Sequence, residues 1–264
     1  MEYKDTNPRR NSKKNKKAKK RARLKKGFIA FLLIFILCAT LVTLSLTVFF
    51  KTEQITVSGN TIYQTNAILE TAAIKTGTNM FLVFDSAVEK QLMAKHPFIE
   101  SVKLKRTLPD KIEIIITEAT EYYCYEYAGQ FFTASKDNRV LAKYSSAPAG
   151  LVDVSAKSLT NLSVGKNVEF TNEEEKNYLT KLLNTLSEYK LEVTSVDVTD
   201  MSAIKVTISD RIVADFGGQT ELEGKTAHLA TLIENLDENV RGSVDLSVWT
   251  PTNNKAYFDK DNLQ

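Results

Sequence analysis

The sequence predicts an α+β protein: a single N-terminal transmembrane helix, then a small β-α-α-β-β domain, then a mixed β-sheet domain with packed helices. Three observations support this prediction. One 24-residue segment has no charged residue, the apolar residues after it repeat at helical and then at strand spacing, and turn residues separate these runs. The chain of 264 residues is long enough for two domains beyond the apolar segment.

The apolar segment covers residues 27–50 and lies between Lys26 and Lys51. As an α-helix it would be about 36 Å long, enough to cross a hydrocarbon core of roughly 30 Å. A signal peptide is the competing interpretation, but its apolar region is shorter and ends in small residues. This segment ends in Phe49 and Phe50. We therefore expect a membrane anchor that is retained.

The charges divide sharply across this segment. Residues 1–26 carry a net charge of +11 and residues 51–264 a net charge of −8, which the whole-chain value of +3 conceals. The positive-inside rule then predicts a cytoplasmic N-terminus and extracellular C-terminal domains. We expect the basic tail, residues 1–26, to be disordered. The basic run could act only as a topology signal, or it could also bind anionic lipid headgroups. Nucleic acid is not expected, because no aromatic residues are interleaved in the run for base stacking.

The cysteines indicate the compartment. Cys38 lies within the predicted span and Cys124 far beyond it, so they cannot pair. The extracellular part therefore has no disulfide of its own, which favours a bacterial cell surface over a secreted eukaryotic module.

One face of the predicted membrane helix carries small residues. Ala39, Thr43 and Thr47 follow one another at four-residue spacing. Such a row allows another helix to approach closely, so these three residues are candidates for a membrane-helix contact.

Residues 51–119 show the pattern of the small domain. A strand at 55–57 precedes a helix at 65–73, and a second helix ends before Pro97. Alternation of apolar with other residues then predicts two strands, at 101–106 and 111–117, joined by a turn. In the second strand, Ile112, Ile114 and Ile116 are expected to face the core.

A resemblance becomes specific between His96 and Glu118. Pro-Phe-Ile, then Ser-Val-x-Leu-x-Arg and Leu-Pro-Asp-x-Ile-x-Ile-x-Ile-x-Glu, resemble the signature of the POTRA domain in the DivIB/FtsQ family of bacterial cell-division proteins. The basic tail, single span and membrane-proximal POTRA domain repeat that family's layout. The low cysteine content and long Lys-rich tail are more similar to the DivIB branch of Gram-positive bacteria.

The region 120–249 is predicted to form the mixed sheet. Short apolar and aromatic runs with hairpin spacing begin it, two amphipathic helices follow, and a strand at 242–249 ends it. This resembles the DivIB/FtsQ β-domain, whose Gly-x-(Ile/Val)-Asp-Leu strand is matched from Gly242 to Leu246. Ser247-Val248-Trp249 departs from the Arg-Tyr that often follows in FtsQ relatives. Residues 250–264 are polar and are expected to form a flexible tail.

The resemblance implies a non-enzymatic scaffold at the division septum. Its implied partners are division proteins of the FtsL and DivIC type and, through them, a septal penicillin-binding protein. The last predicted strand is expected to lie at a sheet edge that a partner segment could extend. The candidate partner-binding residues are Val244, Leu246, Val248, Trp249, Tyr257 and Phe258. The competing interpretation of Trp249 is that its ring caps the core.

Catalytic motifs are present only in fragments. Ser163 and Ser187 each begin an S-x-x-K match, but the S-D-N and K-T-G that accompany it in penicillin-binding enzymes are missing. Gly224-Lys225-Thr226 lacks the earlier glycine of a phosphate-binding loop, and His96 and His228 are too isolated for a metal site. We predict no catalytic residue, metal or cofactor. A POTRA-containing secretion component and, more distantly, a cell-wall hydrolase or transferase remain as alternatives.

Overall fold

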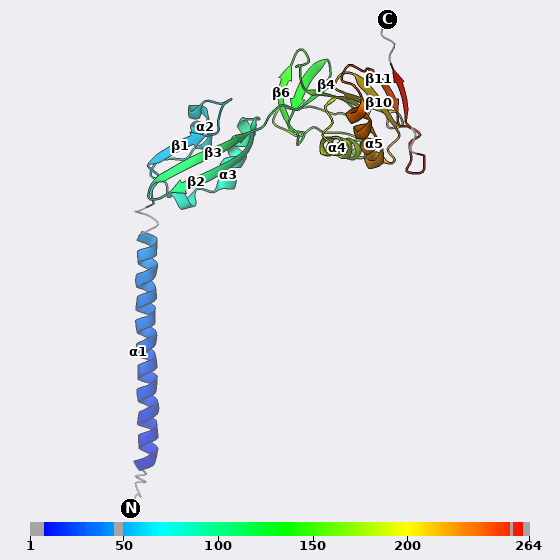
Figure 1. Ribbon diagram of the computed structural model, residues 1–264. Coiled ribbons are helices and arrows are strands. Elements are labelled where there is room, and N and C mark those ends of the chain that lie inside the picture. The colour runs from blue at the N-terminus through cyan, green and yellow to red at the C-terminus, as the bar shows by residue number, and fades with distance from the viewer. Residues whose placement is uncertain (1–7, 45–49, 254–255, 261–264) are drawn as a thin grey trace, which may run out of the picture.

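The computed structural model describes residues 8–44, 50–253 and 256–260 (Figure 1). The fold is α+β, as predicted. A long N-terminal helix, α1 (Pro8–Leu44), leads to a small domain with a three-stranded sheet and then to a larger domain with a nine-stranded sheet. In Figure 1, α1 extends away from both folded domains, and the small domain lies between α1 and the larger sheet.

Helix α1 contains the predicted membrane anchor. Its part from Lys25 to Leu44 is long and apolar enough to cross a membrane, and it is not buried against the rest of the described chain. That combination of length and composition suits a bilayer span. The predicted span of 27–50 continues past the end of α1, and residues 45–49 lie outside the described residues.

The structure differs from the prediction of a disordered tail. Residues 8–26 belong to α1, while residues 1–7 lie outside the described residues. The segment is rich in Lys, Arg and Ala, which have high intrinsic helix propensity. It also extends a helix that the apolar segment has already nucleated, so each added residue avoids the cost of forming a first turn. The helix propensity of these residues and their continuity with the apolar part of α1 therefore outweigh the absence of an apolar face that could be buried.

The small domain has the predicted order of elements. Strand β1 (Gln54–Ser58) precedes α2 (Thr65–Ala72), a short 3₁₀ turn η2 (Met80–Leu82) and α3 (Asp85–Lys95). Strands β2 (Ile99–Thr107) and β3 (Lys111–Glu118) then form an antiparallel hairpin. Strand β1 pairs in parallel with β3, which gives the sheet order β1-β3-β2.

The core of the small domain confirms the predicted register. Ile112 and Ile114 are fully buried and Ile116 is 3% exposed, whereas Ile115 lies on the other face and is partly exposed. Val102 and Leu104 of β2 are buried on the same side as these isoleucines. Helices α2 and α3 contribute Ile68, Val88 and Leu92 to this core. The period-2 pattern therefore placed the hairpin correctly.

The larger domain is built on strands β4 to β12. Their bounds are β4 (Tyr123–Tyr127), β5 (Gln130–Ala134), β6 (Val140–Tyr144), β7 (Val152–Ser155), β8 (Val193–Asp197), β9 (Ile204–Ile208), β10 (Ile212–Gly217), β11 (Gly242–Asp245) and β12 (Tyr257–Lys260). The sheet order is β12-β11-β10-β9-β8-β7-β4-β5-β6. The pairs β4–β7, β7–β8 and β10–β11 are parallel and the others antiparallel, so the sheet is mixed as predicted.

Two helices pack on this sheet: α4 (Glu173–Glu188) and α5 (Leu222–Asn235), which lie side by side below the strands in Figure 1. The side chain of Asn172 caps α4 by accepting hydrogen bonds from the backbone N–H groups of Glu174 and Glu175. Three glutamates in the first turn complement the helix dipole. Both helices bury leucines against the strands, including Leu182 and Leu229, which are fully buried.

The C-terminal segment was predicted as a flexible tail, and this is wrong for residues 257–260. They form β12, which pairs in antiparallel register with β11, Val244 opposite Phe258. Phe258 packs against the core of the larger domain, which explains why this short polar stretch is ordered. Residues 254–255 and 261–264 lie outside the described residues. The strand predicted to be terminal, β11, is therefore an inner strand.

Candidate functional site

The candidate partner-binding residues lie at one end of the nine-stranded sheet. Strand β11 occupies the position between β10 and β12, and β12 is the last strand in the sheet order. The predicted strand at 242–249 ends at Asp245, where Asp245 Oδ1 accepts a hydrogen bond from the backbone N–H of Ser247 at 2.8 Å. The side-chain and backbone hydrogen bonds from Ser247 lower the pKa of Asp245 and so favour its charged, accepting form. The N–H of Ser247 is therefore engaged within the chain and does not belong to an open edge.

Burial separates the six candidates into two groups. Val244 and Leu246 are fully buried, and Phe258 packs against the same core. Val248 is 51% exposed and Tyr257 is 62% exposed. Only the second group has largely exposed side chains, so the sequence pattern did not distinguish the outward-facing candidates from the buried ones, and partner binding by any of them stays a prediction.

Trp249 lies between these groups. Its ring packs directly on Gly224 of α5: a methyl group added at Gly224 would come within 2.3 Å of Cη2 and 2.4 Å of Cζ3 of the indole. The ring is partly buried against the core of the larger domain, and the His228 ring lies 6.2 Å away between centroids. Trp249 thus packs the segment between β11 and β12 against α5. This contact supports the core-capping interpretation, and no local sequence pattern indicated that Gly224 is the residue on which the ring packs.

Lys225, next to this contact, has a structural role. Its side chain is 1% exposed, and Nζ donates a 2.6 Å hydrogen bond to the carbonyl oxygen of Phe216 at the end of β10. Burial lowers the pKa of this ammonium group. The Gly-Lys-Thr sequence therefore helps join α5 to β10 and does not present its lysine to a phosphate.

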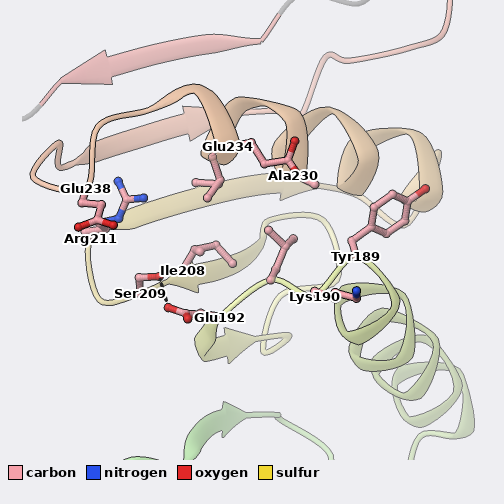
Figure 2. A pocket seen from close by; sticks show the side chains of 11 residues that line it. Tyr189, Lys190, Glu192, Ile208, Ser209, Arg211, Ala230, Glu234 and Glu238 are labelled. Atoms are coloured by element: carbon pink, nitrogen blue, oxygen red, sulfur yellow. Dashed lines mark hydrogen bonds between the residues drawn. The ribbon is translucent and has the colours of Figure 1, made fainter.

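A cleft opens beside the β9–β10 turn (Figure 2). It has a volume of about 640 Å³ and lies between the end of α4, that turn and the second half of α5. Leu191, Ile208 and Ile233 form its apolar part, while its charged residues carry both signs. One of them, Arg211, is held by hydrogen bonds from Nη1 to the carbonyl oxygens of Asp237 and Val240. The lining contains no cysteine or histidine, and no group of three metal-binding side chains occurs in the described parts of the chain.

The other residues singled out from sequence are dispersed. Ser187 and Lys190 are exposed at the end of α4, and Ser163 lies in a loop. His96 ends α3 and contacts the Thr71 hydroxyl at 3.0 Å through Nε2. Within the described residues, Ser187 and Lys190 are linked by a backbone hydrogen bond of 3.0 Å, and no side-chain hydrogen bond joins Ser163, Ser187, His96 and His228 to one another.

In the membrane helix, Ala39 and Thr43 lie one turn apart on α1. The Thr43 hydroxyl donates to the Ala39 carbonyl oxygen at 2.8 Å, a bond within the helix that leaves the face small and apolar. Thr47, the third candidate, lies outside the described residues. Cys38 on this helix and Cys124 in β4 are both unpaired.

Comparison with known proteins identifies the small domain. Residues 50–119 match the family model of the POTRA domain, FtsQ-type. A cell division protein DivIB from Clostridium botulinum (strain Hall) is 28% identical over 232 residues, which covers 85% of this chain and 88% of that protein. A DivIB from Clostridium acetobutylicum is 28% identical over 178 residues, covering 66% of this chain and 70% of that protein. A cell division protein FtsQ from Streptomyces bingchenggensis is 30% identical over 101 residues, or 38% of either chain.

Proposed function

Because the chain is a relative of the DivIB and FtsQ cell-division proteins and carries their type of POTRA domain, we propose that it is a membrane-anchored, non-enzymatic scaffold of the division machinery. The similarity to DivIB over most of both chains carries this proposal. The scaffold would dock partners of the FtsL and DivIC type and link them to the septal penicillin-binding protein. Helix α1 would hold it in the cell membrane, with the basic tail in the cytoplasm and both folded domains outside.

The outer edge of β12 is the proposed docking surface. An edge strand presents backbone N–H and C=O groups that an extended partner segment can pair with, which gives affinity without a deep pocket. Tyr257, at the start of β12, adds a large exposed aromatic side chain of the kind that often dominates binding energy. Val248, in the segment between β11 and β12, adds a second exposed apolar side chain.

The opposite edge of the sheet offers a matched comparison. Strand β6 ends in Tyr144, which is 38% exposed and whose hydroxyl donates a 2.9 Å hydrogen bond to Glu121 Oε1. Tyr144 is therefore less exposed than Tyr257 and is already tied to its own domain. Both edges carry one exposed tyrosine, so substitution of each in turn distinguishes them.

Affinity capture from detergent-solubilised membranes tests the proposal. The intact chain should retain FtsL-type and DivIC-type division proteins, Tyr257→Ala should lose most of this capture, and Tyr144→Ala should retain it. Each exposed tyrosine contributes little to folding, so both variants should keep the circular dichroism of the parent. Capture of a secretion channel instead would refute the division role. Loss with Tyr144→Ala alone would place docking on β6.

A further inference from the structure

The POTRA domain has one end that lies next to the membrane anchor. The loop of residues 77–82 is hydrogen-bonded to the chain where the predicted span ends: the Met80 N–H donates to the carbonyl oxygen of Phe50 at 3.0 Å, and the Gly77 N–H to that of Thr52 at 2.7 Å. Lys51 also forms an antiparallel bridge with Asn79. The rings of Phe50 and Phe81 pack edge to face with centroids 5.2 Å apart. The loop of residues 77–82 therefore lies against residues 50–52, where the predicted span ends.

The β2–β3 hairpin tip lies at the same end. The N–H groups of Glu53 and Gln54 donate to the Asp110 carbonyl oxygen at 2.9 and 3.3 Å. Arg106, near the end of β2, links the hairpin to the loop through Nε to the Met80 carbonyl oxygen at 3.0 Å and through a 2.7 Å ion pair with Asp85. These contacts hold the loop, the hairpin tip and the entry to β1 together as one surface.

This surface exposes large apolar side chains. Phe81 is 46% exposed, Leu82 67%, Phe84 66% and Leu108, at the hairpin tip, 59%. We call these four residues the apolar rim. Four such side chains gathered at one end of a small domain are unusual for a surface that faces only water, and they mark a contact with another apolar phase or molecule.

The length of chain between the anchor and the rim limits its distance from the bilayer. Only residues 45–49 separate Leu44, the last residue of α1, from Phe50. At about 3.3–3.6 Å per residue, the six steps from Leu44 to Phe50 reach at most about 22 Å. Residues 45–49 are themselves apolar or hydroxylic and belong to the predicted span. The rim is tied to Phe50, so it lies at the membrane surface wherever α1 crosses the bilayer.

We infer that the apolar rim inserts into the outer interface of the lipid bilayer and forms a second membrane contact that fixes the orientation of the POTRA domain. Phe and Leu side chains of interfacial segments enter the boundary between headgroups and acyl chains. Lys51 and Lys75 are exposed beside the rim and supply positive charge for lipid phosphates. A shallow groove lined by Ile74, Leu82 and Phe84, with a volume of about 280 Å³, continues the apolar surface between α2 and α3. This inference rests on the membrane anchoring proposed above.

Fluorescence quenching in vesicles tests it with the full-length chain. In a C38A and C124A background, Leu82→Cys is labelled with bimane and reconstituted into vesicles of phosphatidylcholine and phosphatidylglycerol with brominated acyl chains. Ile62→Cys is the matched control, because Ile62 is 52% exposed and its N–H donates to Glu118 at the far end of β3. The eight residues of β3 place that end about 23 Å from Lys111.

The label at position 82 should lose most of its fluorescence to brominated lipid, and the label at position 62 should keep it. Adding Phe84→Asp and Leu108→Asp should restore the fluorescence at position 82, because charges oppose insertion of the rim. These two side chains are mostly exposed, and unchanged circular dichroism would verify the fold. Equal quenching at both positions in protein that floats with the vesicles overturns the inference and leaves the anchor intact. Failure to float overturns both.

Discussion

Replacing Ile114 by Ala tests how the POTRA domain is held together. Ile114 is fully buried in the middle of β3, between Val57 of β1 and Leu104 of β2 in the sheet register. Removing its outer carbons leaves a cavity, and such substitutions in cores cost about 2–5 kcal/mol. A domain of this size, residues 50–119, has a stability of only about 4–10 kcal/mol. The variant is therefore expected to lose a large fraction of the stability of that domain.

Hydrogen exchange followed by mass spectrometry is the suitable assay, because Trp249 reports only on the larger domain. At tenfold per 1.4 kcal/mol, the expected loss speeds global exchange of the β2–β3 amides by about 30-fold to about 4,000-fold. Peptides from the larger domain should exchange at unchanged rates. Ile115→Ala is the control: its side chain lies on the opposite, partly exposed face of β3, and we expect less than about a fivefold change. Equal effects of the two substitutions would refute the register on which the domain's core depends.

Three further predictions concern the rest of the chain. Protease added to cells stripped of their wall should degrade the chain beyond residue 51 and spare the basic tail, since the charge is +11 before the anchor and −8 after it; protection of the folded domains would reverse the orientation. Gly224→Ala should push the indole of Trp249 off α5 at a cost of about 1–3 kcal/mol and shift its emission to longer wavelength, and an unchanged spectrum would contradict the packing described. Burial raises the pKa of Tyr178 from 10.0 to about 12. The stability of the larger domain is therefore undiminished below pH 10 and falls as the pH rises from 10 to 12, because the unfolded chain loses this proton before the folded chain does. Tyr178→Phe removes a hydroxyl with no hydrogen-bond partner in the described chain, so the variant should be as stable as the parent at pH 7. On going to pH 11, urea unfolding should show that the variant loses about 1.4 kcal/mol less stability than the parent. Identical pH dependence of the two proteins would count against the burial of this hydroxyl.

The amino-acid sequence by itself determined the features that depend on local pattern. The uncharged run from 27 to 50 predicted the long apolar helix, while the orientation that the flanking charges indicate stays a prediction. Alternation in β2 and β3 predicted which isoleucines are buried, because side chains of a strand point to opposite faces in turn. The motif from His96 to Glu118 was specific enough to indicate the family. None of these inferences required knowledge of a distant neighbour.

Only the tertiary structure decided where the larger sheet ends. Alternation shows which face of β11 is buried, but the strand that lies beside it depends on hydrogen bonds between remote backbone groups, and those groups are the same in every residue type except proline. Tyr257 and Phe258 lie in a polar stretch that forms β12 because Phe258 packs against a core made of residues from other parts of the chain. The seat of Trp249 on Gly224 and the exposure of Leu82 beside the anchor have the same origin. Each of these features depends on contacts between segments that are far apart in the chain, and a local sequence pattern does not predict such contacts.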